Sequence, residues 1–362
     1  MKRFKGPSSH FPIGPSRPIT STPDLPVNLF TKLKKCLPLV PCFFAALISS
    51  CDRSNMVIVD AGSGTWEVVR EPQDATYFYD IYFADRLRGW VVGDSGKILH
   101  TDDAGTSWQP QTSGTRYALR CVVFPDEHTG WVAGSHASVL HTDNGGISWT
   151  PQAVAIDSSR TFLSICFVDA MTGWAVTNYG EIIHTANGGV TWVPQTSGTH
   201  WAITSICFLD RLNGWAVATN RIVLRTIDGG ARWNTQEIPI RSPTIFTDIY
   251  FSDSYTGWIS TTMAASSSLE DGSPVLRTTD SGVTWVTVAE VPLIDITSIR
   301  FINNTMGWAV GMNGIYYTNA GGSNWVCQYE GLSDVLVGLS FVEGTDGWAL
   351  GFTGTILRYT IR

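Results

Sequence analysis

The sequence has little charge, and the charge that it has is unevenly distributed. Charged residues make up 15% of the 362 residues, and the formal net charge is −7. Residues 1–50 hold seven Lys and Arg but only one acid, Asp24, so the remainder carries 24 − 7 basic and 31 − 1 acidic residues, a net charge of −13. An acidic body excludes broad nucleic-acid binding, because that binding depends on phosphate contacts from Lys and Arg.

The sequence also lacks the common signatures of chemistry. It has no P-loop and no G-x-S-x-G element, and none of its seven cysteines stands in a C-x-x-C or at a Cys/His spacing typical of zinc sites. Cys166 and Cys207 precede the same Phe in adjacent repeats, where a disulfide cannot reach, so we expect buried free thiols. We therefore predict no catalytic residue, no metal and no cofactor.

The two residue types that are unusually abundant, Trp and Gly, indicate a structure made of strands. The chain holds 15 Trp and 35 Gly, and this pair indicates many strands and tight turns rather than long helices.

A basic and apolar segment near the N-terminus has the layout of an export signal. "KLKKCLPLVPCFFAALISSC" runs from Lys32 to Cys51, with three lysines, an apolar run and then small residues. The run is short for a membrane span, and its end resembles a bacterial lipobox, in which Cys51 would be lipidated and become the first mature residue. The alternatives are an ordinary signal peptide and a single membrane anchor. We expect an exported, membrane-anchored lipoprotein at the periplasmic face or cell envelope.

The segments around this signal divide the chain. Residues 1–31 are rich in Pro and Ser, so either they form a disordered extension or translation begins near Val27 or Leu29. We assign residues 32–50 to the signal peptide, 51–60 to a linker and 61–362 to one folded domain.

Internal repetition is the strongest pattern in the chain. Seven Gly-Trp dipeptides, separated by 41, 43, 41, 43, 50 and 40 residues, place their tryptophans at Trp90, Trp131, Trp174, Trp215, Trp258, Trp308 and Trp348. Each unit reads as an apolar strand ending in Phe, the Gly-Trp strand, a turn, a third strand and a fourth that begins at another Trp. Four short strands in about 42 residues describe a propeller blade. The sequence predicts an all-β, seven-bladed β-propeller of four-stranded blades.

The ends of the chain predict how the ring closes. The last repeat stops after its third strand, whereas "GTWEVV", with Trp66, is a spare strand at the other end. We predict that residues 64–70 pair with residues 354–360 to complete the seventh blade.

A second motif, "HTDDAGTSW" (His100 to Trp108), occurs in six copies. Its acidic position holds Asp103, Asn144, Asn187, Asp228, Asp280 and Ala320 in turn. A catalytic acid would not tolerate Asn or Ala, whereas a turn-former would, because Asp and Asn both accept hydrogen bonds from nearby backbone NH groups. Glycine two residues after this position in every copy indicates a turn with positive φ. We interpret these residues as architecture.

The repeats resemble a known family. The second motif matches the Asp-box (bacterial neuraminidase) repeat, and "PQTSGT" with "F-x-D-x-x-x-G-W-A-V" resembles the photosystem II stability/assembly factor family over about residues 60–362. The resemblance implies a non-enzymatic propeller that holds a membrane-protein subunit during assembly, partly through an arginine-rich patch. Such relatives also occur in non-photosynthetic bacteria.

Loops that lead into the blades suggest a partner site. In propellers these loops share a face with the loops between the second and third strands, and here blades two to five would present a basic and aromatic arc. Its candidate residues are Arg116, Tyr117, Arg120, Arg160, His200, Trp201, Arg221 and Arg241, with Lys97 as reinforcement. The opposite arc would be acidic, through Glu71, Asp74, Glu290, Asp295, Glu330 and Asp334. The longer loop after Trp258 reads as a tolerated insertion.

These observations favour a monomeric binding scaffold for a membrane or envelope protein. The alternatives are a sialidase-like glycoside hydrolase, because Asp-boxes occur in those enzymes, and a glycan-binding propeller.

Overall fold

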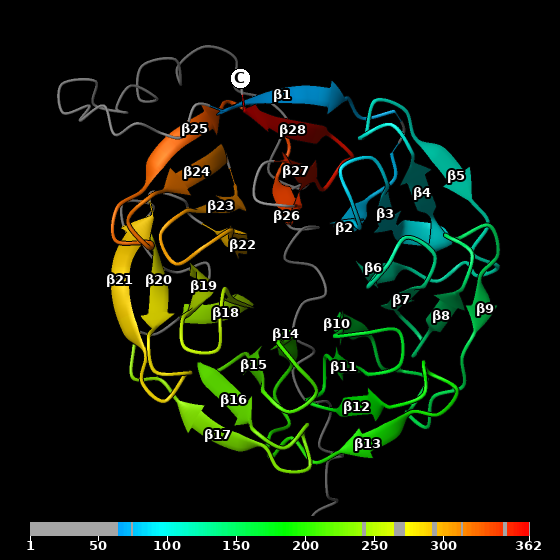
Figure 1. Ribbon diagram of the computed structural model, residues 1–362, viewed down its shortest axis with the longest axis horizontal. Coiled ribbons are helices and arrows are strands. Elements are labelled where there is room, and N and C mark those ends of the chain that lie inside the picture. The colour runs from blue at the N-terminus through cyan, green and yellow to red at the C-terminus, as the bar shows by residue number, and fades with distance from the viewer. Residues whose placement is uncertain are drawn as a thin grey trace, which may run out of the picture. The chain divides into compact units, whose positions relative to one another are not determined.

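The structure is a computed structural model that describes residues 64–73, 75–240, 244–263, 272–291, 295–312, 314–342 and 346–361. Seven four-stranded antiparallel sheets form a ring (Figure 1), which confirms the seven-bladed propeller. Ile58–Arg362 is one compact unit. The proposed leader, signal, linker and Cys51 lie outside the described residues. No helix in the described part of the chain has the length and hydropathy needed to cross a bilayer.

The blades follow one another in chain order, and each runs from an inner strand at the axis to an outer strand at the rim. In that order the strands are as follows: blade 1, β2 (Phe78–Phe83), β3 (Gly89–Gly93), β4 (Ile98–Thr101) and β5 (Gln109–Gln111); blade 2, β6 (Leu119–Val123), β7 (Gly130–Gly134), β8 (Val139–Thr142) and β9 (Thr150–Pro151); blade 3, β10 (Phe162–Phe167), β11 (Gly173–Thr177), β12 (Ile182–Thr185) and β13 (Val193–Gln195); blade 4, β14 (Ile203–Phe208), β15 (Gly214–Ala218), β16 (Ile222–Thr226) and β17 (Asn234–Glu237); blade 5, β18 (Thr244–Phe251), β19 (Gly257–Met263), β20 (Ser273–Thr278) and β21 (Val286–Val291); blade 6, β22 (Ile296–Phe301), β23 (Gly307–Gly311), β24 (Gly314–Thr318) and β25 (Val326–Glu330); blade 7, β26 (Leu336–Val342), β27 (Asp346–Gly351), β28 (Ile356–Ile361) and β1 (Gly64–Arg70). One short 3-10 turn, η3 (Asp94–Gly96), joins β3 to β4.

The ring closes as the sequence predicts. Strand β1 is antiparallel to β28, with Gly64 opposite Ile361 and Trp66 opposite Tyr359. The N-terminal strand thus supplies the outer strand of blade 7, and the two described ends of the chain lie side by side at the rim (Figure 1). Trp66 is buried in that blade.

The Gly-Trp dipeptides join neighbouring blades. Trp90 is fully buried and stacks on Phe124 of the next blade, with ring centroids 3.5 Å apart. The glycine before it is required because a Cβ on Gly89 would lie 2.6 Å from the Phe83 ring. Each blade repeats this stack on its successor, through the pairs Trp131–Phe167, Trp174–Phe208, Trp215–Phe251, Trp258–Phe301, Trp308–Phe341 and Trp348–Phe83. The core is therefore a closed belt of aromatic stacks between blades.

The Asp-boxes are turns, as their sequence predicts. The side chain of Asp103 accepts the NH of Ser107 at 2.8 Å, while Thr101 Oγ1 donates to Asp103 and accepts the NH of Gly105. Gly105 has φ +88°. The same backbone NH bond is made by the side chains of Asn144, Asn187, Asp228 and Asp280. Asp and Asn are interchangeable here because both offer the oxygen that the turn requires.

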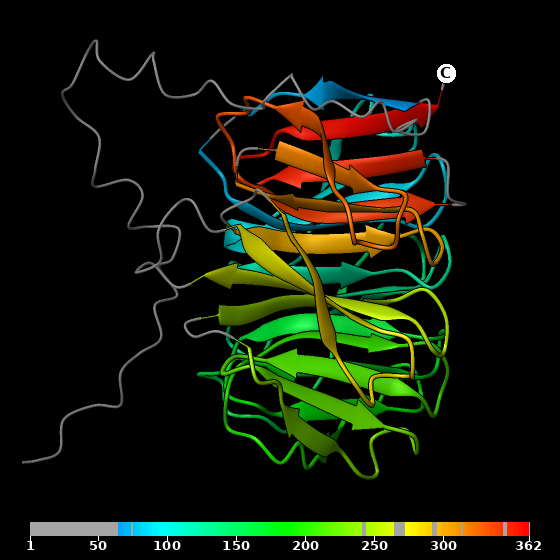
Figure 2. The same ribbon diagram turned by 90° about the vertical axis from the view of Figure 1, so that its left-hand side faces the viewer.

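The two faces of the ring carry different loops. Loops that lead into each blade lie with the loops between second and third strands, as Ser135 N donating to Ala118 O and Thr219 N donating to Ala202 O show. We call this the top face. Loops between first and second strands lie with the Asp-boxes, because box amides bond to their carbonyls, as in Gly188 N to Met171 O. We call this the Asp-box face; Figure 2 shows the strands running between the two faces.

Candidate protein-binding face

The top face of blades 2 and 3 carries paired aromatic and basic side chains. The ring of Tyr117 stacks on His136, with centroids 4.0 Å apart and planes 12° from parallel. In blade 3, the Arg160 guanidinium lies 4.1 Å from the centre of the Tyr179 ring and pairs with Glu181 at 2.7 Å. These contacts link the loop that leads into each blade to the 2–3 loop of the same blade, so both loops are held in place.

The exposed members of the predicted arc come from a repeated loop. "SGTRYA" leads into blade 2 and "SGTHWA" leads into blade 4, so Arg116 matches His200 and Tyr117 matches Trp201. All four side chains are exposed, and Trp201 retains 37% of its surface although it is aromatic. A threonine hydroxyl fixes each loop locally: Thr115 Oγ1 accepts the NH of Tyr117, and Thr199 Oγ1 accepts the NH of Trp201. Rigid exposed aromatic and basic side chains are typical of binding hot spots.

Backbone strain concentrates at the 2–3 turns of the same blades. His136 and Ala137 have φ of 60° and 51°, and Asn220 and Arg221 have φ of 66° and 62°. The equivalent turns of blades 3 and 7 place positive φ on glycine alone, where it has no steric cost, and the turn of blade 1 has one such non-glycine residue, Ser95, before its glycine. A non-glycine residue in this conformation costs about 1 kcal/mol. This strain in blades 2 and 4 lies beside Tyr117 and Trp201, the exposed aromatic residues of the arc.

Other predicted basic residues are engaged by the fold. Arg221 is half-buried and pairs with Glu237 at 2.9 Å. Arg120 lies on the inner strand β6, where its guanidinium sits 3.9 Å from the centre of the Tyr79 ring. Lys97 donates to Thr76 Oγ1 at 2.8 Å. Arg241 lies outside the described residues, as does most of the inserted loop after Trp258. The structure thus separates exposed Arg116, Tyr117, His200 and Trp201 from basic residues that stabilise the blades.

The acidic arc predicted opposite forms only in part, because Glu71 and Glu330 are exposed whereas Asp334 and Asp295 are held by the fold. Asp334 is buried and accepts the NH groups of Thr353 and Thr355, and Asp295 accepts the hydroxyl of Thr262. Burial raises the pKa of Asp295. The 2–3 loop of blade 7 folds over Asp334, whereas Asp295 is held by the end of β19 in blade 5. Asp74 lies outside the described residues.

Sequence reasoning missed an aromatic cluster at the mouth of the central channel. Phe352 stacks on Tyr77 with centroids 4.5 Å apart and meets Tyr79 edge-on. The Tyr79 hydroxyl donates to Asp94 at 2.6 Å. This cluster continues the aromatic and basic arc across blades 7 and 1. A sequence signal existed, since Tyr79 stands where the inner strands of other blades carry Thr, Leu, Val or Arg.

The channel holds buried charges that were also missed. Inner strands of all seven blades line a cavity of about 420 Å³. Asp248 accepts hydrogen bonds from Ser205 and Ser298 and pairs with Arg300 at 2.5 Å. Asp80 accepts the NH groups of Ile81 and Val122, and burial raises its pKa to about 7. These groups link adjacent blades around the channel. Among the described residues, no group of three His, Cys, Asp or Glu side chains is placed to hold a metal.

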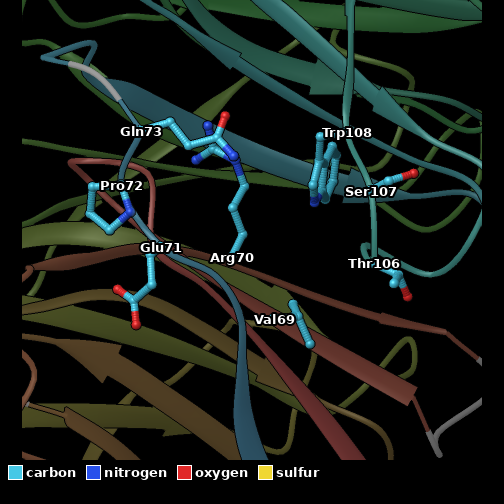
Figure 3. Close-up of a pocket in the computed structure, with 8 residues that line it drawn as sticks. All are labelled: Val69, Arg70, Glu71, Pro72, Gln73, Thr106, Ser107 and Trp108. Atoms are coloured by element: carbon cyan, nitrogen blue, oxygen red, sulfur yellow. The ribbon is translucent and has the colours of Figure 1, made fainter.

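A second hollow lies at the rim where the ring closes. It has a volume of about 420 Å³ and separates the end of β1 from the Asp-box of blade 1. Figure 3 shows Val69 and Arg70 on one side and Ser107 and Trp108 on the other. It bears none of the exposed arc residues.

Comparison with known proteins shows similarity to one family over part of the chain. Residues 59–154 match the family model described as photosynthesis system II assembly factor YCF48. The photosystem II assembly protein Ycf48 of Thermosynechococcus vestitus is 40% identical over 47 residues, which cover 13% of this chain and 13% of that relative. A solved structure of YCF48 bound to D1 peptide superposes with a TM-score of 0.67 and 19% identity, over 82% of this chain and 97% of that one.

The chain is a propeller similar to the photosystem II assembly factors. This assembly-factor-like propeller also shares its fold with enzymes. The GH74 enzyme of Niastella koreensis superposes with a TM-score of 0.58 and 12% identity, over 76% of this chain and 50% of that one. Such likeness at low identity shows the shared fold alone, so the task depends on the residues that each propeller exposes.

Proposed function

We propose that the chain is a non-enzymatic scaffold that binds a membrane or envelope protein during its assembly, through the top face of blades 2 to 4. The observation that carries this proposal is the set Arg116, Tyr117, His200 and Trp201, which is exposed, held by local hydrogen bonds and placed beside strained turns. Similarity to YCF48, which has been solved with a D1 peptide bound, supports a polypeptide as the ligand.

The same proposal includes export and attachment. The lysines and apolar run before Cys51 support an exported chain that is lipidated at that cysteine, and a tethered scaffold would meet membrane-protein partners at high local concentration. We expect the scaffold to act as a monomer. The partner segment should carry carboxylates, because Arg binds carboxylates in a bidentate manner and presents its guanidinium here on an exposed loop.

The test is partner capture by variants of the exposed set. The partner is first identified by cross-linking and co-purification of the full chain from its host membranes. Arg116→Glu combined with Trp201→Ala should then weaken its binding about tenfold or more, because truncation of a hot-spot Arg or Trp costs about 2 kcal/mol. Both side chains are exposed, so the thermal midpoint of unfolding should stay unchanged.

A matched control lies on the other face. Arg232 is also exposed but belongs to an Asp-box, so Arg232→Glu should leave capture intact. Equal capture by the double variant and the wild-type chain would refute this binding face. Hydrolysis of a fluorogenic sialoside, or retention on a glycan array, would favour the carbohydrate alternatives instead.

A further inference from the structure

Exposed apolar side chains gather on the Asp-box face of blades 3 to 5. Six of them retain between 49% and 78% of their surface. They are Met171, Val190, Leu212, Ile227, Tyr255 and Val283, and we call them the apolar arc. The two loops of blade 6 carry Thr305 and Ser323 at matching positions. Blades 1 and 2 add one such side chain each, Leu87 and Ile147, with 56% and 87% of their surface exposed. The exposed apolar side chains are therefore densest at blades 3 to 5, where each blade carries two, and they thin out toward blade 6.

The apolar arc forms a level surface. Met171, Leu212 and Tyr255 occupy one position of the 1–2 loop in successive blades, and their carbonyls accept the NH groups of Gly188, Gly229 and Ser281 at 2.9 Å. Because blades are related by rotation about the channel axis, equivalent positions lie at one height above the ring. Side chains spread across three blades at one height suit a flat partner better than a ligand in a pocket.

The chain joins the propeller at this same face. Strand β28 leaves its 2–3 turn at the top face and ends at Ile361, opposite Gly64 in β1. Gly64 therefore lies at the Asp-box face. Whatever precedes Gly64, including the basic and apolar run from Lys32, is connected there.

The charged side chains of the Asp-box face indicate which kind of lipid surface it can contact. The backbone NH of Arg232 lowers the pKa of Asp228, so this carboxyl is ionised at neutral pH. Asp210 and Asp253 are held in the adjacent 1–2 loops by backbone NH groups. Arg211, which pairs with Asp169 at 2.9 Å, and Arg232 lie on the same face and offset part of this negative charge. The face therefore has no excess of basic side chains that would draw it to anionic lipid, whereas a zwitterionic surface accepts apolar side chains without a charge requirement.

We propose that the Asp-box face rests on a zwitterionic lipid surface, with the apolar arc inserted at the level of the headgroups. The proposed tether joins at blade 7 and the arc lies across the ring in blades 3 to 5, so two attachments on opposite sides hold the face parallel to the membrane. The top face then points away from the lipid, where a partner can reach Arg116 and Trp201. This inference rests on the proposed membrane attachment and adds the orientation.

Hydroxyl-radical footprinting of the full chain in phosphatidylcholine vesicles tests this orientation. Met171 and Tyr255 in the arc, and Tyr117 and Tyr179 on the top face, are exposed and react with the radical. Lipid contact should lower modification of the arc residues about fivefold relative to the two top-face tyrosines, because inserted side chains leave water. Combined Val190→Ser, Leu212→Ser and Ile227→Ser should abolish this protection and leave the thermal midpoint unchanged.

Three outcomes would overturn the proposal. One is equal modification of Tyr255 and Tyr179 on vesicles. A second is stronger protection on anionic phosphatidylglycerol than on phosphatidylcholine. The third is protection of Met171 in the full chain without vesicles that grows with protein concentration, which would assign the arc to a second copy of the chain. None of these depends on partner capture, so the orientation and the proposed function fail separately.

Discussion

The contact between blades 1 and 2 and the contact between blades 7 and 1 share an aromatic stack but differ in their hydrogen bonds at the rim. Both contain the aromatic stack, with centroids 3.5 Å apart for Trp90 and Phe124 and 3.6 Å apart for Trp348 and Phe83. Only the first has a glutamine clasp. There Gln111 accepts from Trp149 Nε1 at 3.2 Å and donates to the carbonyl of Gly145 at 2.9 Å.

The closing contact has a different outer edge. Three residues after its tryptophan, β1 carries Val69 where β5 carries Gln111, and Trp108 Nε1 donates instead to Gly105 O of its own turn. The rim hollow of Figure 3 occupies the place of the clasp. Arg70 reaches the carbonyl of Gly354 and helps to hold β1. The stack is thus the common requirement of the ring, whereas the clasp is a reinforcement that only some contacts have.

The largest effect should come from the stacks. Phe83→Ala and Phe124→Ala each remove a buried ring between two tryptophans and should each lower the free energy of unfolding by about 3–5 kcal/mol. Urea unfolding followed by tryptophan fluorescence measures both. Equal losses of unfolding free energy would show that the aromatic stack stabilises the closing contact as much as an internal one. A far smaller loss for Phe83→Ala would contradict the equivalence.

The clasp should have an intermediate effect. Gln152 accepts from Trp192 Nε1 at 3.1 Å and donates to Gly188 O at 2.9 Å, so Gln152→Ala leaves two polar groups without partners and should cost about 1–3 kcal/mol. Gln236 is the matched control. It occupies the same repeat position in blade 4 but is exposed, and within the described chain Trp285 Nε1 has no hydrogen-bond partner. Gln236→Ala should leave the free energy of unfolding unchanged. Equal losses of unfolding free energy in both variants would show that the clasp does not stabilise the contact.

Much of this fold could be predicted from the sequence because the sequence is built of repeats. The Gly-Trp dipeptide occurs seven times and the Asp-box six times, so the structural role predicted for one copy can be tested against the others. The spare strand with Trp66 is recognised because it matches the fourth strand of these repeats. The exposure of Tyr117 and Trp201 follows from the same register, since both fall in a short loop before an inner strand.

The channel and the surfaces were harder to predict, because they depend on contacts between distant repeats. Asp80 and Asp248 occupy the same place in "DIYF", but only the ring shows that Arg300, from a third blade, neutralises Asp248. Sequence spacing also could not show that Arg160 and Arg221 pair within their own blades. Loop charge was mistaken for surface charge at Asp334, because its burial depends on how the following hairpin folds over it.

The smallest effect, and the sharpest test of the comparison, is to build the missing clasp. Gln328 shows that a glutamine at a bulge can serve, since its side chain accepts from Trp66 Nε1 at 3.1 Å in the contact between blades 6 and 7. Val69 lies at the same bulge of β1, beside Trp108, so Val69→Gln should place an amide within reach of that indole and raise the free energy of unfolding by about 1 kcal/mol. Val69→Met fills the hollow with a side chain of similar length that has no amide, and its unfolding midpoint in urea is the reference. A gain for glutamine over methionine would show that the hydrogen bonds, and not the filled volume, reinforce the contact; equal midpoints would mean that the closing contact needs no clasp.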